Sequence, residues 1–254
     1  METTTTDIDE ARDWQGRLLD CAACERREEQ AEGHCRLGHS CVHDRYARRI
    51  DRCFRWNPQW AKNYLDHPYF ETRAVAAKHV EVFLLPRLVA DPDETVRQSV
   101  AQRLPVNSRH LLGLARDPHR EVRIRVAERL ETKDLVAMIC DQDYYVRQIV
   151  ARRLPPGYLV RMLHDRDPEV RKVVARRVDA QWLHALAADS ELPVRLEALK
   201  RMEPAQLKRY RDDPDWRVRY EVASRIDPAE LEPLRADPEE AVRELVAQRL
   251  VASG

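Results

Sequence analysis

A motif that recurs with a period of 24 residues constrains the fold of this chain more than any other feature. Its clearest copy runs from Asp91 to Leu104 and contains a Val-Arg pair at residues 96–97. The arginine of that pair recurs at a spacing of 26 residues once and 24 residues five times, as Arg97, Arg123, Arg147, Arg171, Arg195, Arg219 and Arg243. Residues 72–80 form a weaker, eighth copy. Such a period indicates a solenoid, in which each repeat buries its apolar face against its neighbours.

Each copy has the apolar spacing of an amphipathic α-helix. In the clearest copy Val96, Val100, Ala101 and Leu104 share one face. The sequence predicts that Asp91 is the N-cap and that the following proline begins the helix. The same Asp-Pro pair is expected to begin helices at three further aspartates, Asp117, Asp213 and Asp237. Prolines directly after the last leucine, Pro105 and Pro155, mark the helix ends.

The second part of each repeat is too short for another full helix. The α-helix takes about 13 of the 24 residues, which leaves room for two turns and one short apolar piece such as residues 158–164. The sequence therefore predicts an all-α fold class. We expect about eight repeats over residues 61–254, each with an α-helix and a short 3₁₀-like helix, behind a small cysteine-rich domain over residues 1–60.

The first arginine of each copy falls inside the apolar arc of its helix. At about 100° per residue, Arg97 projects between Ala101 and Leu104. A buried cation needs a partner, and an aspartate stands six residues earlier in every clear copy: Asp91, Asp117, Asp141, Asp165, Asp189, Asp213 and Asp237. We expect an Arg-Asp ladder, in which each guanidinium forks onto a helix-capping carboxylate of the same or the neighbouring repeat. The rival hypothesis is that these arginines line a groove and bind phosphates.

Charge and hydropathy restrict the partners and the compartment. The 44 basic and 44 acidic residues cancel, which argues against a bulk binder of nucleic acid or of a membrane surface. No stretch reaches the roughly 20 apolar residues of a membrane-spanning helix. Residues 1–10 lack the basic and apolar regions of a signal peptide. We expect a short disordered leader and a cytoplasmic protein without a membrane partner.

Cysteines are concentrated in front of the repeats. Four of them, Cys21, Cys24, Cys35 and Cys41, read CxxC-x10-C-x5-C, and a disulfide framework is not expected without a secretory signal. Four thiolates in a short polar segment predict a metal site, either a structural zinc or an iron-sulfur cluster. Three histidines are alternative zinc ligands: His34, His39 and His43. Cys53 is the reserve ligand.

The remaining candidate residues have structural interpretations. Cys140 stands alone in a repeat, beside Met138 and Ile139, and is expected to be a core residue. Aromatic residues follow the cysteines closely: Phe54, Trp56, Trp60, Tyr64, Tyr69 and Phe70. We expect them to pack the cysteine-rich domain onto the first repeat and to shield its metal site. Stacking on nucleobases is the less favoured alternative.

The order of these motifs resembles a known family. The CxxC-x10-C-x5-C segment, then residues 44–50, then 24-residue copies of Asp-Pro-x-x-x-Val-Arg-x-x-Val-Ala-x-Arg-Leu are similar to the leucine-rich repeat variant proteins of nitrogen-fixing bacteria. The resemblance implies a right-handed superhelix of alternating α- and 3₁₀-helices. It also implies an N-terminal 4Fe-4S cluster held by Cys21, Cys24, Cys35 and Cys41, and a setting near nitrogen-fixation genes.

Three classes of function remain. The favoured one is a scaffold that binds a protein partner through the solenoid surface and is linked to electron transfer or redox sensing by the cluster. The alternative is a nucleic-acid-binding helical-repeat protein with a structural zinc or iron-sulfur site. An enzyme is not expected, because no nucleophile elbow, phosphate loop or His-Glu-x-x-His motif is present.

Overall fold

The computed structural model describes residues 10–252, which divide into two compact units. The first unit ends at Glu131 and the second begins at Thr132. The expected boundary between residues 60 and 61 falls within the first unit and stays a prediction. Of the expected leader, only Glu10 lies inside the described residues. None of the described helices is long and apolar enough to cross a membrane.

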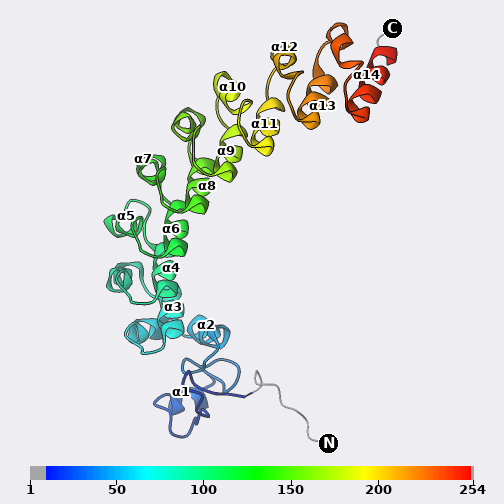
Figure 1. Cartoon of the computed structure of the whole chain (residues 1–254). Helices are drawn as coiled ribbons and strands as arrows, with labels where there is room; N and C mark the ends of the chain where they lie inside the picture. The colour runs from blue at the N-terminus through cyan, green and yellow to red at the C-terminus, as the bar shows by residue number, and fades with distance from the viewer. Residues whose placement is uncertain (1–9, 253–254) are drawn as a thin grey trace, which may run out of the picture. The chain divides into compact units, whose positions relative to one another are not determined.

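The first unit holds the cysteine-rich segment and the first repeats (Figure 1). Its α-helices are α1 (Arg27–Ala31), α2 (Ala47–Trp56), α3 (Phe70–His79), α4 (Glu94–Arg103), α5 (Arg109–Leu114) and α6 (Arg120–Ala127). Its 3₁₀-helices are η1 (Pro58–Tyr64) and η2 (Val82–Leu88). Helices α2, α3, α4 and α6 pack in succession, each against the next. The weak copy at residues 72–80 therefore falls on α3, a regular member of the stack.

The second unit continues the alternation of long and short helices. The long ones are α8 (Tyr144–Arg153), α9 (Pro168–Ala175), α11 (Leu192–Leu199), α13 (Trp216–Arg225) and α14 (Glu240–Ala252). The short α-helices are α7 (Thr132–Leu135), α10 (Leu183–Leu186) and α12 (Pro204–Leu207). The 3₁₀-helices are η3 (Val136–Met138), η4 (Pro156–Met162), η5 (Ala180–Trp182), η6 (Lys208–Tyr210), η7 (Pro228–Glu230) and η8 (Glu232–Leu234). In Figure 1 the long helices of this unit follow one side and the short helices the other.

The predicted fold class is confirmed, with long helices that are mostly shorter than expected. Helix α4 has 10 residues and α9 has 8, against an expectation of about 13. The predicted core of the clearest copy is buried, with Val96, Val100 and Ala101 fully inaccessible to solvent. Helices α4 and α8 end one residue before the leucine that precedes proline, as the sequence predicts.

The predicted N-caps are wrong by two residues. Helix α4 is capped by Asp93, whose carboxylate accepts the Thr95 amide at 2.8 Å. Asp143, Asp167 and Asp215 cap later helices in the same way. Asp91 instead accepts the Asp93 amide at 2.9 Å, so the Asp-Pro pair forms the turn before the helix. The reason is that the Asp91 carboxylate is already engaged by an arginine of the preceding repeat.

The Arg-Asp ladder is present and joins neighbouring repeats. Arg97 donates to both carboxylate oxygens of Asp117, at 2.7 Å through Nε and 2.9 Å through Nη2. Within the two described units, further pairs are Arg73–Asp91, Arg147–Asp165, Arg171–Asp189, Arg195–Asp213 and Arg219–Asp237. The partner of each carboxylate is therefore the arginine of the repeat before it, which selects one of the two arrangements that the sequence allowed.

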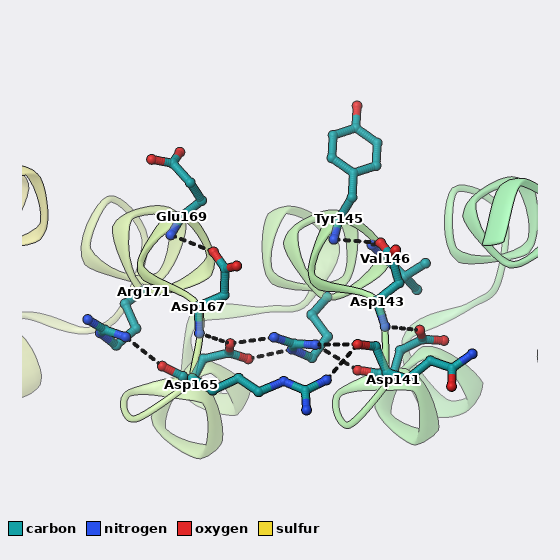
Figure 2. A network of polar contacts seen from close by, with 11 residues as sticks. Asp141, Asp143, Tyr145, Val146, Asp165, Asp167, Glu169 and Arg171 are labelled. Carbon is teal, nitrogen blue, oxygen red and sulfur yellow. Dashed lines mark hydrogen bonds and ion pairs between the residues drawn. The ribbon is translucent and has the colours of Figure 1, made fainter.

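The same arginine also closes the turn of its own repeat. Arg147 donates through Nη1 to the Asp141 carbonyl at 2.8 Å, and Arg171 donates to the Asp165 carbonyl at the same distance. Figure 2 shows Asp165 at the centre of this network, with Asp167 as the cap of α9. Each guanidinium thus binds a carbonyl before its helix and a carboxylate after it. These contacts neutralise its charge and use its hydrogen-bond donors inside the apolar arc.

A second set of arginines stabilises the other end of the long helices. Arg225 donates to the carbonyls of Leu199 and Met202, at 2.7 and 2.5 Å. Further members bind the helix of the preceding repeat in the same way: Arg103, Arg129, Arg177, Arg201 and Arg249. Carbonyls in the last turn of a helix lack intrahelical partners, and a cation there also opposes the helix dipole. The sequence signal for this second set is an arginine that recurs at the end of each copy, directly before an aliphatic residue, and its role was not predicted.

The ladder carboxylates make stability depend on acid pH. The hydrogen bond from Arg219 lowers the pKa of Asp237 below its ordinary value, despite opposing burial. Burial raises the pKa of Asp189, but hydrogen bonds from the Arg171 side chain and the Glu191 amide outweigh it and lower the pKa overall. A pKa that is lower in the folded state gives stability that is present above the unfolded value, about 3.9, and is lost as the pH falls through the folded value.

We therefore expect the urea midpoint of unfolding to stay constant from about pH 7 to pH 5.5 and to fall steeply below about pH 4. Circular dichroism at a series of pH values measures this midpoint. In the variant Asp237→Asn the loss between pH 5 and 3 should be smaller, because one titrating carboxylate is gone. An acid transition of the same size in both proteins would contradict this assignment.

Candidate metal centre

The structure brings the five N-terminal cysteines into one neighbourhood. Burial and the negative charge of a Cys24 or Cys21 thiolate raise the pKa of Cys35, and burial and the charge of Cys53 or Cys35 raise the pKa of Cys41. Cys35 therefore links the CxxC pair to the later cysteines. Cys21, Cys24, Cys35 and Cys41 are all partly exposed, whereas Cys53 on α2 is fully buried.

Backbone amides point at several of these sulfur atoms. The Arg26 amide donates to Sγ of Cys24 at 3.4 Å, and the His43 amide donates to Cys41. The Val42 amide donates to Cys53. Hydrogen bonds of this kind stabilise the thiolate form and help to set the reduction potential of iron-sulfur clusters.

Burial disfavours the thiolate form of these cysteines when no metal is bound. It raises the pKa of Cys41 to about 12, and it also raises the pKa of Cys21 and of Cys35. A thiolate at Cys41 is therefore stable at neutral pH only when a metal cation compensates for the lost hydration. Amide donors beside buried thiols fit a ligand set for a metal.

The loops between the cysteines are fixed on α2 and η1. Arg26 lies 4.6 Å from the centre of the Trp60 ring and donates to the Tyr64 hydroxyl at 3.2 Å. Tyr64 in turn donates to Glu25 at 3.0 Å, so the two residues that follow Cys24 are held by the aromatic side chains of η1. Asn57 is buried at the end of α2 and donates to the His34 carbonyl at 2.7 Å, which fixes the chain before Cys35.

The expected aromatic core is partly confirmed. Phe54, Trp60 and Tyr64 are buried. Tyr69 stacks on Trp14 with ring centres 6.0 Å apart. Trp56 departs from the expectation, because 46% of it is exposed at the last position of α2.

Two further residues lie differently from what the sequence suggested. Cys140 is exposed, so its assignment to the core is wrong: it follows the buried pair Met138 and Ile139 at the turn after η3. The three histidines proposed as zinc ligands pack against aromatic rings instead, His34 on Trp60, His39 on Trp56 and His43 on Tyr64.

The donor set fits an iron-sulfur cluster by its chemistry, because four of the N-terminal cysteines are partly exposed and supply sulfur ligands. A 4Fe-4S cluster binds its four thiolates through different irons, so the ligands surround the cluster without meeting at one point. The cysteines therefore fit this group, with Cys21, Cys24, Cys35 and Cys41 as the predicted ligands and Cys53 in reserve. The choice among the five stays a prediction.

Comparison with known families bears directly on this site. Residues 11–63 match the family described as "LRV protein FeS4 cluster", which covers all five N-terminal cysteines. Residues 144–167 match the family "Leucine rich repeat variant" and span one full repeat, from α8 to the cap of α9. The first match identifies the cofactor as a 4Fe-4S cluster and sets the zinc alternative aside.

Two relatives extend the comparison. A curated protein of Rhodobacter capsulatus, "Uncharacterized 27.7 kDa protein in nifB 3'region", is 52% identical over 96 residues, which are 38% of this chain and 39% of that protein. The solved structure "A leucine-rich repeat variant with a novel repetitive protein structural motif" is 40% identical, with a TM-score of 0.86. The match covers 91% of this chain and 98% of that one. The chain therefore belongs to the leucine-rich repeat variant family, and its N-terminal segment is the 4Fe-4S cluster domain of that family.

Proposed function

We propose that this protein is an interaction scaffold that couples a partner bound on its repeats to the redox state of its cluster. One observation carries the scaffold part of the proposal. In the second unit the first residues of four successive long helices are apolar: Tyr144, Pro168, Leu192 and Trp216. Tyr144 is 42% and Trp216 is 39% exposed. These four residues, named here the apolar row, occupy the same position of the repeat.

The apolar row has the composition of a protein interface. Aromatic residues are enriched in interfaces and supply many of the side chains that dominate binding energy. Trp216 also packs edge-to-face on Tyr220, with ring centres 6.4 Å apart, which widens the apolar surface. The equivalent position is charged in α4 and α6, Glu94 and Arg120, and in α14, Glu240, whereas α3 of the first unit has Phe70 there.

The ladder weakens the nucleic-acid alternative. That alternative needs the repeat arginines to be free for phosphates. Arg97 and Arg147 are instead buried and donate to a carboxylate and a carbonyl at the same time. A phosphate would have to displace both partners, which supports a structural role for these arginines.

The redox part of the proposal rests on the cluster and on a relative. The cluster supplies one-electron chemistry when it is bound, and the residues of its domain precede the repeats along the chain. The name of the Rhodobacter capsulatus relative places its gene in the 3' region of nifB. We propose that this chain acts in nitrogen fixation, by binding and electron exchange and without turning over a substrate.

A matched pair of variants tests the scaffold. Tyr144→Ser combined with Trp216→Ser removes two members of the apolar row, while Tyr158→Ser removes an equally exposed tyrosine from η4. Partners crosslinked to the wild-type protein in a nitrogen-fixing host, and bound again as purified proteins, should be lost with the first variant and kept with the second. Equal recovery with both variants would refute the apolar row as the binding surface.

The redox link has a separate test. Protein purified without oxygen should bleach with dithionite and recover on exposure to a mild oxidant, with about four iron and four sulfide per chain throughout. A cluster that cannot be reduced, or that is destroyed by one cycle, would leave only the scaffold part of the proposal.

A further inference from the structure

A tight hairpin lies between two of the predicted ligands, Cys35 and Cys41. It is closed by a pair of backbone hydrogen bonds between Arg36 and Ser40, both 2.8 Å long. Gly38 at its tip has φ +69°, a conformation that side chains disfavour. The turn leaves the Leu37 side chain at the surface, where 45% of this leucine is exposed. A large apolar side chain is therefore presented to solvent within four residues of both ligands.

Helix α2 extends this surface with basic side chains. Arg48, Arg52 and Trp56 are spaced four residues apart and so share one face of the helix. Arg52 donates to the His39 carbonyl at 2.8 Å, and the His39 ring lies 5.6 Å from the Trp56 ring. The hairpin therefore rests on this face of α2. We call the combined surface the hairpin patch: Arg36, Leu37, His39, Arg48, Arg52 and Trp56.

The hairpin patch is apolar at its centre and positive at its rim. Leu37 and Trp56 are exposed, and Arg36 and Arg48 are exposed without an ion pair among residues 10–252. The acidic residue on the neighbouring turn of α2, Asp51, is already bound by Arg55 at 2.6 Å and by His79 at 2.9 Å. Asp51 is therefore not available to neutralise the positive charge of the hairpin patch.

We propose that the hairpin patch is the docking site for an acidic one-electron carrier protein. The proposal rests on the redox function proposed above and names its partner and its surface. A small apolar centre with a charged rim suits the transient complexes of electron carriers, which bury little area and depend on electrostatic steering. The exchange oxidises the carrier by one electron and reduces the cluster by one; no bond is made or broken, and no proton moves.

The location of the patch favours an electron carrier over a nucleic acid. Arg36 follows Cys35 directly, His39 stands two residues before Cys41, and α2 carries Cys53. A carrier gains from this position because electron transfer requires a short path to the cluster. A nucleic acid needs only positive charge and an aromatic ring to bind. It would gain nothing from a site beside the cluster.

The test uses the holoprotein and two acidic carriers, a plant-type [2Fe-2S] ferredoxin and a flavodoxin. The variant Arg36→Glu with Arg48→Glu reverses two rim charges without removing a described hydrogen bond. Its control is Arg152→Glu with Arg161→Glu, two exposed arginines of the repeats. At low salt, calorimetry should show about a tenfold or greater weakening of carrier binding in the first variant and less than a twofold change in the control. Iron and sulfide contents should equal those of the wild type in both.

The possible outcomes separate this inference from the proposed function. Reduction by dithionite without binding of either carrier would overturn the docking site alone. Failure of dithionite reduction would overturn both. Equal carrier binding in the two variants would also refute the hairpin patch. Loss of binding to a single-stranded oligonucleotide in the first variant, with carrier binding unchanged, would assign the patch to nucleic acid instead.

Discussion

Replacing Asp165 by asparagine is expected to lower the free energy of unfolding by about 3–5 kcal/mol, because it leaves a buried guanidinium without its anion. The side chains of Arg147 and Asp165 are only 4% and 7% exposed, and two hydrogen bonds of 2.7 and 2.8 Å join them. Asparagine keeps the size of the side chain and an oxygen that can still accept the Asp167 amide. The substitution therefore removes the negative charge that Arg147 binds but keeps the turn, so the expected loss of stability measures the ion pair.

The same substitution two residues later is the matched control. Asp167 caps α9 by accepting the Glu169 amide at 2.9 Å, and no arginine among residues 10–252 forks onto it. Asparagine is about as good an N-cap as aspartate, so Asp167→Asn should change stability by less than about 0.5 kcal/mol. Urea unfolding followed by circular dichroism at pH 7 compares the two variants. Similar midpoints for both would show that the ladder contributes no more than an ordinary cap.

An apolar replacement of the whole pair separates stability from function. Changing Arg147 to methionine together with Asp165 to leucine removes both charges and should recover most of the loss, since a buried ion pair is often no more stabilising than well-packed apolar residues. A stable double variant that no longer binds a partner would point to a role of the ladder at the surface. A double variant as unstable as Asp165→Asn would show that the other contacts of the pair, Arg147 with the Asp141 carbonyl and Asp165 with the Asp167 amide, are the larger contribution.

The repeat pattern predicted the Arg-Asp pairing but not which aspartate each arginine binds. Co-recurrence of arginine and aspartate predicted the pairing, because a cation in an apolar arc must be neutralised. The pattern did not decide whether Arg97 binds within its repeat or across to Asp117, since an aspartate recurs both six residues before such arginines and 18 or 20 residues after them. It also misplaced the cap: Asp91 and Asp93 are both good N-caps, and only the position of the preceding arginine excludes the first.

The spacing of the cysteines predicted where a metal site lies in the chain, but not which groups surround it. Four thiols in a polar segment predicted a metal site, and the family match then identified the cofactor. The exposure of Cys140 and Trp56 could not be predicted, because Trp56 is the last residue of α2 and Cys140 follows the end of η3, where a shift of one residue reverses burial. The hairpin at residues 36–40 likewise depends on contacts with α2 that no local pattern records.

Changing Cys41 to serine is expected to abolish the 4Fe-4S cluster. Serine lacks the thiolate that an iron requires, and one missing ligand opens the cluster to solvent and oxygen. Iron and sulfide should fall from about four each per chain to below one, and the visible absorption should disappear. The same result is expected for Cys21, Cys24 and Cys35. Circular dichroism should still show the helices of the second unit, which the ladder holds independently of the cysteines.

Cys53→Ala is the decisive comparison, because Cys53 is the reserve ligand. Its thiol is fully buried on α2 and accepts the Val42 amide, which suits a core residue beneath the cluster as well as a ligand. If Cys41 is a ligand and Cys53 is not, Cys53→Ala should keep about four irons and lose only the stability of a small buried side chain, about 1–2 kcal/mol. If Cys53→Ala instead empties the site while Cys41→Ser keeps its iron, the fourth ligand lies on α2. Electrons would then enter the cluster through the helix face that carries Arg52 and Trp56, and the tip of the hairpin would matter less.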